Sequence, residues 1–469
     1  MASLLINPDI NDILGGQKYL IINAPAVDTR LPWAAWHHPY GPLLIGTELS
    51  SRGKDVRFID ALHSSSEGKI PRTKINTFEI DGYKIDNWQF GTPPGKIINI
   101  LQRWIKEGWS PDVILISCAI SYWWPATSDL IHRIKKQYGI PVYLGGGYPT
   151  AYPEHAIANT EADFVISGNL TGISCQATDF SLYKPLSHPL ISAVRIFASN
   201  ETGDLVARPK ESFVDEILEK AKLGVSKFIL FDEWISIDQY QPLKDILASV
   251  ILSNPRVLGN RLKPLFIAPG NISPKLIDKD LAVLFRDANF RTISFHDDIS
   301  HSPYEVQYPS TFEDYRNSVA ALHGAGYKPR TEQIDAAVLI GLPNENITDL
   351  AKRVIELSSI VGSVHLVPYQ FTPNNFVGNK YADWLSQHNG HLDLSHLNGK
   401  LYPLARLAGA KLEEYWELNR LVALLNSKYH NHTFDFSSDS LVSNMVRNSL
   451  NSRLWDPFYH QVQKEEVSQ

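Results

Sequence analysis

Thiols are the scarcest chemistry-bearing side chains of this sequence. It holds two cysteines, Cys118 and Cys175, which lie 57 positions apart. Two thiols cannot form a disulfide framework, a four-thiolate zinc site or a three-thiolate iron–sulfur cluster within one chain. Cys118 lies within or just past an apolar run, so we predict a small buried hydrophobic residue there rather than a nucleophile.

Histidine and aspartate gather at one place, in His296, Asp297, Asp298 and His301. Their nitrogen and oxygen donors suit a divalent metal. Adjacent residues at a strand end point to opposite faces, however, and seldom bind one ion together. We therefore favour solvated loop polarity and predict no metal site. No Ser–His–Asp spacing, phosphate-binding loop or paired-carboxylate signature stands out elsewhere.

Three consecutive glycines, Gly145 to Gly147, follow the apolar run Val142–Leu144. Glycines let a backbone approach a ligand closely, and a following helix offers unpaired N–H groups to a phosphate. The same residues could equally form a tight strand-to-helix turn without a ligand. The adjacent residues Trp123 and Trp124 also have two interpretations. Their indole rings could stack on a flat ligand, or they could pack as ordinary aromatic residues of a core or an interface.

The composition excludes several classes of protein. The 469 residues include 44 Lys and Arg against 50 Asp and Glu, a net charge of −6, which argues against nucleic-acid binding. Hydrophobic residues make up 43% and charged residues 20%, as in a globular protein. No apolar run approaches the ~18 residues of a membrane span, and no export signal stands out. We expect a soluble, cytoplasmic protein that does not interact with membranes.

The elements that would position these residues alternate between strands and helices. In the first part, the strand predictions are Tyr19–Asn23, Val56–Ile59, Val113–Ser117, Val142–Leu144 and Asp163–Ser167. Helices are expected before Gly53, over Ile97–Ile105 and before Tyr138. This alternation predicts a doubly wound parallel sheet, in which ligands bind beyond the carboxyl ends of the strands.

The second part repeats the alternation. The strand predictions are Ile191–Phe197, Phe228–Phe231, Leu265–Ala268, Thr292–Phe295, Ala336–Ile340 and Val364–Tyr369. Capping-box patterns at Ser212–Asp215 and Thr311–Asp314 predict helix starts. Six such units predict a partial parallel barrel. Beyond it, Leu404–Leu425 and Leu441–Leu450 read as amphipathic helices. We expect domains over 1–170, 191–375 and 376–469, with a linker over 171–190.

The first part resembles the cobalamin-binding domain of cobalamin-dependent radical S-adenosylmethionine (SAM) enzymes. The resemblance rests on Pro39–Leu44, Pro111–Ser117, and Gly145–Thr150 with Pro153 and Glu154. It implies cobalamin as a cofactor. His37 and His38, near the corrin-facing loop, could reach the cobalt, but as histidines of a surface loop they need no role, and we favour that interpretation. The cofactor-binding residues that it implies are Ser117, Ser121, Gly145, Gly146, Gly147 and Thr150. Where relatives often have Gly-Glu-Gly-Glu, this chain has Gly168 to Thr171.

The second part resembles the radical-SAM barrel, on Phe213–Ile217, Phe231–Glu233, Phe295–Asp298 and Ile340–Glu345. The fold class implied is α/β, with a Rossmann-like cobalamin-binding domain, a partial (β/α)6 TIM-like barrel and a helical C-terminal region. Residues implied for SAM, should its binding survive, are Asp232, Glu233, Asp297, Gly341 and Glu345. The C-x3-C-x2-C cluster motif is missing, since its three ligand positions fall on Ile191, Arg195 and Ala198. We therefore expect no iron–sulfur cluster.

Three functions stay open at this point. The first is a cobalamin-binding enzyme that acts on a small molecule without a cluster, with methyl transfer as the nearest family chemistry. The second is a non-catalytic homologue, either a partner subunit of a cluster-bearing radical-SAM enzyme or a cobalamin carrier or sensor. The third is an enzyme that has lost cobalamin as well. A homodimer is a further expectation, and the substrate, the axial cobalt ligand and the catalytic residues are not identified.

Overall fold

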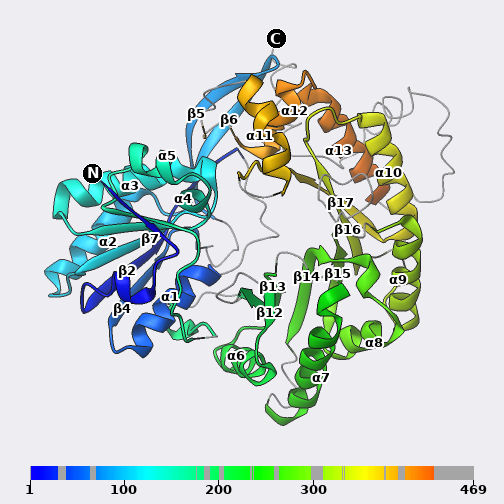
Figure 1. Ribbon diagram of the computed structural model, residues 1–469, viewed down its shortest axis with the longest axis horizontal. Coiled ribbons are helices and arrows are strands. Elements are labelled where there is room, and N and C mark those ends of the chain that lie inside the picture. The colour runs from blue at the N-terminus through cyan, green and yellow to red at the C-terminus, as the bar shows by residue number, and fades with distance from the viewer. Residues whose placement is uncertain are drawn as a thin grey trace.

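Two parallel sheets, each with helices packed beside it, organise the molecule (Figure 1). The computed structural model describes residues 2–29, 39–63, 70–175, 177–183, 191–199, 205–232, 235, 237–257, 264–296, 310–329, 331, 333–373, 376–388, 394 and 397–426. Each sheet has six strands, and all neighbouring strands within them run parallel. The chain is therefore a mixed α/β protein, as the alternating pattern predicts.

The first sheet has its strands in a doubly wound order. Across the sheet they are β1 (Ser3–Ile6), β9 (Phe164–Ser167), β8 (Val142–Gly145), β7 (Val113–Ser117), β2 (Lys18–Asn23) and β4 (Asp55–Asp60). Leaving out the edge strand β1 and starting from β4, the neighbouring strands are the second, first, third, fourth and fifth of this sheet along the chain. Such a sheet has its topological switch point between the first and third strands, here β2 and β7. The five predicted strands are confirmed, and β1 has no equivalent among the predictions.

Helices connect these strands. They are α1 (Tyr40–Ser51), α2 (Pro94–Lys106), α3 (Trp124–Tyr138), α4 (Gly147–Ala151) and α5 (Pro153–Asn159). Pro94 at the first position of α2 is an ordinary start signal, since proline lacks the N–H that a first turn leaves unpaired. Gly139 is an ordinary stop signal after α3, with a φ of 65°.

The sheet is anchored at its amino-terminal edge by Asp112, which accepts hydrogen bonds from the backbone N–H groups of Gln17 and Lys18.

An antiparallel hairpin occupies a stretch for which the sequence predicts no regular structure. It consists of β5 (Arg72–Ile80) and β6 (Tyr83–Phe90), and β6 also pairs with β3 (Ala26–Asp28). Most of β5 is exposed, so it lacks the alternating apolar pattern by which a half-buried strand is recognised. Its tip lies next to the C-terminal helices (Figure 1), where Asp81 accepts hydrogen bonds from Arg406 at 2.7 Å and from the N–H of Leu412 at 3.1 Å.

The second sheet follows the chain order strand by strand. Its strands are β10 (Ile191–Val194), β13 (Lys227–Leu230), β14 (Leu265–Ile272), β15 (Phe290–Phe295), β16 (Ile334–Ile340) and β17 (Ser363–Pro368). The helices between them are α6 (Lys210–Lys222), α7 (Tyr240–Val257), α8 (Lys279–Asp287), α9 (Phe312–Gly324) and α10 (Ile347–Ile360). Six parallel strands are thus confirmed in the predicted segments.

Three local predictions are wrong. The predicted strand Ile191–Phe197 ends at Val194, because the N–H groups of Ile196 and Phe197 turn to the Asp232 carboxylate; Phe197 then begins β11 (Phe197–Ser199), which pairs with β12 (Leu205–Ala207). The predicted cap at Ser212 is absent, since α6 begins at Lys210 and the Ser212 hydroxyl accepts from Arg208. The capping box of Thr311 and Asp314 is confirmed.

The third wrong prediction concerns the C-terminal helix Leu404–Leu425. It is broken into α12 (Pro403–Leu407) and α13 (Leu412–Asn426), because Gly409 takes a φ of 90° between them. A further helix, α11 (Phe376–His388), precedes them. The predicted helix Leu441–Leu450 and the pair His37–His38 lie outside the described residues. None of the helices in the described ranges is both long and apolar enough to cross a membrane.

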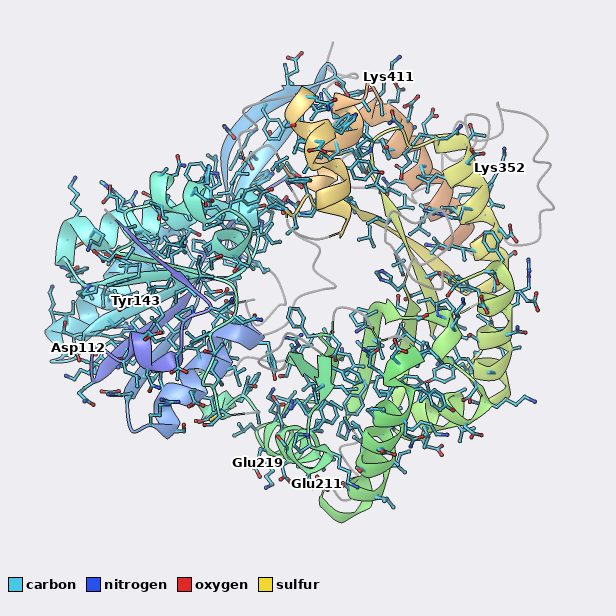
Figure 2. The ribbon with its side chains drawn as sticks, in the orientation of Figure 1. Asp112, Tyr143, Glu211, Glu219, Lys352 and Lys411 are labelled. Atoms are coloured by element: carbon cyan, nitrogen blue, oxygen red, sulfur yellow. The ribbon has the colours of Figure 1, made fainter. Side chains whose placement is uncertain are left out.

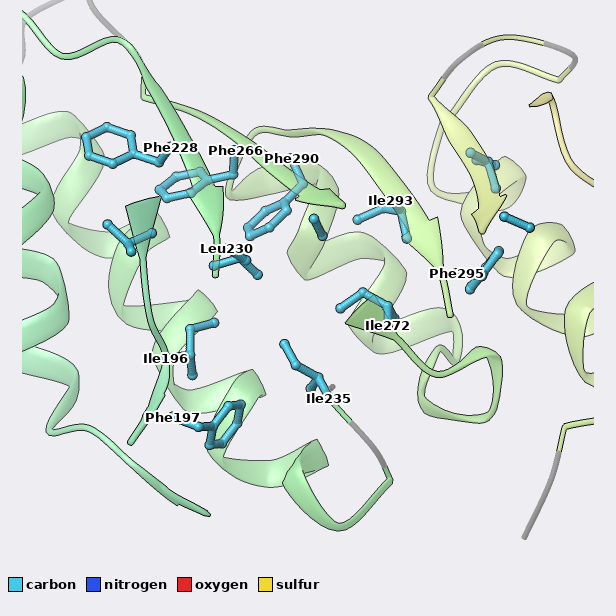
Figure 3. Close-up of a cluster of buried hydrophobic side chains, with 14 of the residues drawn as sticks. Ile196, Phe197, Phe228, Leu230, Ile235, Phe266, Ile272, Phe290, Ile293 and Phe295 are labelled. Carbon is cyan, nitrogen blue, oxygen red and sulfur yellow. The ribbon is translucent and has the colours of Figure 1, made fainter. Parts of the chain in front are cut away.

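The core of the second sheet is rich in aromatic side chains (Figure 3). Phe228, Phe266 and Phe290 come from three neighbouring strands, and their rings stack with centroid distances of 5.5 and 4.9 Å. Near the carboxyl ends, Ile196 and Ile235 are completely buried. Close packing of large side chains across adjacent strands fixes their register, and it places the residues that follow each strand at a common edge.

The chain between the two sheets is held by buried carboxylates. The Glu48 side chain on α1 accepts hydrogen bonds from Arg52 at 2.6 Å and from the N–H groups of Ser174 and Cys175 at 2.9 and 2.8 Å. Burial raises the pKa of Glu48, but these hydrogen bonds outweigh it and bring the pKa down to about 2. The carboxylate is therefore ionised and fully engaged over the whole physiological pH range.

We expect Glu48→Gln to lower the free energy of unfolding at neutral pH by about 1–3 kcal/mol, because a neutral amide cannot replace a charged acceptor of several hydrogen bonds. Since the folded pKa of Glu48 lies below its ordinary 4.5, its contribution is complete above that pH and is lost as the pH falls toward 2. Urea denaturation between pH 3 and 7 measures both effects. The exposed Glu107→Gln serves as the control, and equal stability of the two variants would contradict the prediction.

Candidate functional site

The carboxyl ends of the two sheets lie on the sides that face each other. Asp112, at the amino-terminal edge of the first sheet, points away from the second sheet (Figure 2). Gln370, just after β17, donates a hydrogen bond of 3.3 Å to the Ser121 hydroxyl, just after β7. The Tyr152 hydroxyl donates to the carbonyl of Phe371 at 3.4 Å. Residues beyond the strand ends of one sheet therefore contact those of the other.

A buried carboxylate, Asp28, is the centre of this junction. It accepts hydrogen bonds from the Tyr122 hydroxyl at 3.3 Å and from the Asn398 amide at 2.9 Å, and it forms an ion pair with Lys400. Its partners come from segments almost 300 residues apart in the chain. A buried carboxylate needs such partners to offset the loss of hydration. Asp28, at the end of β3, thus fastens the C-terminal segment to the first half of the chain.

Apolar side chains surround this polar network. Tyr148 and Cys118 follow the ends of β8 and β7, and they belong to one buried cluster with Tyr369, Phe371 and Leu397. Cys118 is 1% exposed, and burial raises the pKa of its thiol to about 12. A neutral buried thiol is a poor nucleophile and a poor metal ligand. The prediction of a buried hydrophobic residue at Cys118 is confirmed.

The glycine turn has a packing reason of its own. Gly146 takes a φ of 105°, and a Cβ atom there would lie 2.6 Å from the carbonyl oxygen of Cys118. A Cβ atom on Gly147 would lie 2.2 Å from the carbonyl oxygen of Ala119, whereas on Gly145 it would meet Ile166 at an ordinary 3.8 Å. Two of the three glycines are therefore required by the fold, with or without a ligand.

The structure brings together the six residues that the resemblance assigns to cobalamin. Ser117 ends β7 beside Gly145, Ser121 follows one turn later, and the glycine turn leads into Thr150 on α4. The Ser121 hydroxyl accepts a hydrogen bond from Gln370, and the Thr150 hydroxyl accepts one from the N–H of Gly168 at 3.1 Å. These residues share the edge of the sheet next to its switch point.

The residues assigned to SAM lie apart from these, on the second sheet. Asp232, just after β13, is 6% exposed and accepts hydrogen bonds from the N–H groups of Ile196 and Phe197 at 3.0 and 2.8 Å. Burial raises the pKa of Asp232 against the effect of these bonds. Glu345 accepts from the N–H of Gly341 at 2.8 Å and from the Tyr415 hydroxyl at 2.9 Å. Both carboxylates thus also position loops.

Part of the predicted set cannot be placed. Glu233, Asp297, Asp298 and His301 lie outside the described residues. His296 is described, and its Nδ1 lies 2.9 Å from the carbonyl oxygen of Gly270. A carbonyl only accepts, so Nδ1 carries the hydrogen.

Sequence reasoning missed a buried charge cluster on α6. Glu216 is completely buried and binds Arg208 at 2.7 Å, Lys220 at 2.6 Å and the Thr178 hydroxyl at 2.9 Å. Burial alone would raise the pKa of Glu216, but Lys220 and Arg208 lower it overall. The spacing of Glu216 and Lys220 is that of an ordinary exposed helix pair, so only the tertiary packing distinguishes it.

A second missed group lies at the end of β4. The Tyr183 hydroxyl donates to Asp60 at 2.7 Å, and His63 Nδ1 lies 2.6 Å from the same hydroxyl. Because the phenol hydrogen is committed to Asp60, His63 must donate through Nδ1. Burial raises the pKa of Asp60 and lowers that of His63. Asp60 and His63 are three positions apart, but Tyr183 lies about 120 positions further on, so no local motif marks the group.

Comparison with known proteins gives a structural likeness only. No protein-family model and no curated protein matches the chain. Among solved structures, the radical S-adenosylmethionine methyltransferase TsrM from Kitasatospora setae, with tryptophan substrate and a SAM analogue bound, is similar with a TM-score of 0.57 and 14% identity, over 97% of this chain and 98% of that one. TsrM with cobalamin and a [4Fe-4S] cluster bound gives 0.56 and 13%, over 96% and 98%. The chain therefore has a TsrM-like fold along nearly its whole length.

The glycine turn yields a matched pair of variants. We expect Gly147→Ala to destabilise the ligand-free protein by about 1–3 kcal/mol, because its methyl group would overlap the Ala119 carbonyl. Gly145→Ala should leave the stability nearly unchanged. Thermal unfolding of both variants without added cofactor measures the difference. A Gly147→Ala protein as stable as the Gly145→Ala protein would show that the turn is not determined by packing.

The Asp28 junction makes a separate prediction. Asp28→Asn removes the charge that pairs with Lys400, so the segment 397–401 should open more readily, by about 2–3 kcal/mol. Hydrogen–deuterium exchange of the amides in that segment reports the change. Asp129→Asn, which removes an exposed carboxylate from a surface pair with Arg133, is the control. Unchanged exchange in Asp28→Asn would mean that the ion pair does not hold the segment.

Proposed function

We propose that this chain is a cobalamin-binding protein with a radical-SAM-like barrel that functions without an iron–sulfur cluster of its own. One observation carries the proposal: a TsrM-like fold along nearly the whole chain, in a sequence with only two cysteines. TsrM has been solved with cobalamin and with a [4Fe-4S] cluster. The proposed activity is methyl transfer, or other two-electron chemistry, on a small molecule.

The residues present do not fit a cluster. Its three ligand positions fall on Ile191, Arg195 and Ala198, at and just after β10, and none of these side chains can bind iron as a thiolate does. Cys118 is buried in the other half of the fold, and Cys175 lies beside Glu48. Across the ranges that the structure describes, no three His, Cys, Asp or Glu side chains are grouped to hold a metal ion.

The switch point of the first sheet supports cobalamin binding. Doubly wound sheets bind ligands beyond the strand ends at this point, which here separates β2 from β7. The hydroxyl groups of Ser117, Ser121 and Thr150 lie at this edge, and no described residue accepts a hydrogen bond from them. Each could donate to the amide and phosphate groups of the cofactor. Cobalamin, when bound, supplies a cobalt ion that can carry a methyl group.

The second candidate is a non-catalytic homologue, such as a partner subunit of a cluster-bearing enzyme or a cobalamin carrier. This candidate is favoured because two residues that the resemblance assigns to SAM already hold loops of the protein. Asp232 holds the turn after β10, and Glu345 holds the Gly341 loop against Tyr415. Carboxylates that position loops are explained without a ligand. Co-purification with a cysteine-containing barrel homologue would support the partner-subunit role.

Cobalamin retention tests the proposal. The purified protein, incubated with hydroxocobalamin and passed through gel filtration, should keep the visible corrin bands at about one cofactor per chain. Ser117→Phe places a large ring at the switch point and should lose the bands while the protein stays folded. Ser3→Phe, on the exposed edge strand β1, is the matched control and should keep them. A colourless wild-type protein would contradict cobalamin binding in both candidate functions.

A further inference from the structure

Arg195 is a cation without a counter-charge in direct contact. It follows β10 immediately, at the carboxyl edge of the second sheet. Its side chain forms no hydrogen bond or ion pair with any residue in the described part of the chain, and its Nε atom is buried without a partner. Leaving a buried donor unsatisfied is costly, and for a guanidinium the cost is larger than for a neutral group. Such a group is a candidate for binding an anion.

No carboxylate in the described part of the chain is in direct contact with the guanidinium. Tyr40, the first residue of α1, lies within electrostatic range of Arg195, Arg208, Glu216 and Asp232. Glu216 is committed to Arg208 and Lys220, and the Asp232 oxygens accept the N–H groups of Ile196 and Phe197. These five charged side chains comprise three cations and two carboxylates. Glu216 is shared by two of the cations, and Asp232 lies within electrostatic range of Arg195 although no hydrogen bond or ion pair joins the two, so the guanidinium has a nearby counter-charge but no hydrogen-bonding partner among the described residues.

An unpartnered acceptor lies in the same place. The Asn271 side chain on β14 donates to the carbonyl oxygens of Leu230 at 3.3 Å and Asp232 at 2.9 Å, so its amide nitrogen is fully used. Asn271 is 3% exposed, and its Oδ1 atom has no hydrogen-bond partner. Asp232 has amide partners but no cation in an ion pair with it, and burial raises its pKa. Asp232 and Asn271 thus each lack a hydrogen bond from a positively charged donor in the described part of the chain.

We propose that Arg195 binds the carboxylate of a ligand that carries an α-amino-acid group, and that Asp232 and Asn271 face its ammonium group. A guanidinium pairs with a carboxylate through two parallel hydrogen bonds. A positive and a negative side chain next to each other complement a zwitterion, whereas Asp232 would repel a doubly charged phosphate. Arg195 stands at one of the positions that the resemblance assigns to a cluster ligand, so the guanidinium would fix the amino-acid group where no iron is available.

This inference rests on the proposed function only for the identity of the ligand. If the protein uses SAM, the methionyl part of SAM supplies the α-amino-acid group. A free amino acid is the second source. S-adenosylhomocysteine carries the amino-acid group, and 5′-methylthioadenosine has the same adenosyl thioether without it. L-methionine and L-tryptophan supply the group without the nucleoside. Isothermal titration of the full chain with these four compounds therefore separates the sources.

We expect the wild-type protein to bind S-adenosylhomocysteine more tightly than 5′-methylthioadenosine. Arg195→Gln should weaken binding of S-adenosylhomocysteine at least about tenfold, the loss of a charged hydrogen-bonded pair, and leave 5′-methylthioadenosine unchanged. Arg195→Lys, which keeps the charge, should recover part of the affinity. Arg291→Gln, an exposed arginine on β15, is the matched control and should bind like the wild type. Circular dichroism checks that each variant is folded.

The remaining outcomes are distinct. If neither nucleoside binds but an amino acid binds in an Arg195-dependent manner, the inference holds with the second source, and SAM use in the proposed function fails. If S-adenosylhomocysteine binds equally to wild type and Arg195→Gln, the inference is overturned while SAM binding stands. If none of the four compounds binds, the inference is overturned, and cobalamin retention decides the proposed function independently.

Discussion

Buried carboxylates that need complete hydrogen bonding determine how the two sheets are joined. Glu48 ties α1 to the chain at Ser174, Glu216 ties α6 to Thr178, and Asp28 ties β3 to Lys400. A charge removed from water is tolerated only when its partners are all in place, so each carboxylate accepts one arrangement of the surrounding segments. The connections between the halves are therefore specific, although none is a long regular element.

With these connections in place, the carboxyl edges of the two sheets face each other. The switch point between β2 and β7 belongs to the first sheet, and Arg195 with Asp232 belongs to the second. Residues after β17 contact residues after β7, so the two edges form one junction. Arg195 and Asp232 lie at the other end of the second sheet from β17, and there Tyr40, the first residue of α1, comes within electrostatic range of both.

The sequence predicts the strands well because each is an apolar run with a clear end. The sequence does not predict local structure correctly where contacts between distant segments determine it. The strand after Ile191 stops because Asp232, far along the chain, takes two of its N–H groups, and the hairpin β5–β6 has too little buried surface to show a pattern. For the site, the glycine turn is visible in sequence, but its packing against Cys118 is not. The unpaired state of Arg195 depends on which neighbours are already engaged, and no local motif encodes that.

We propose a cobalamin-binding fold that operates without a metal–sulfur electron source. The most direct test is the cobalt, iron and acid-labile sulfide content of the full chain, purified without oxygen and reconstituted with hydroxocobalamin, iron and sulfide. We expect about one cobalt per chain, with iron and sulfide at background. Iron and sulfide at about four per chain, with the electron paramagnetic resonance signal of a reduced cluster, would contradict it.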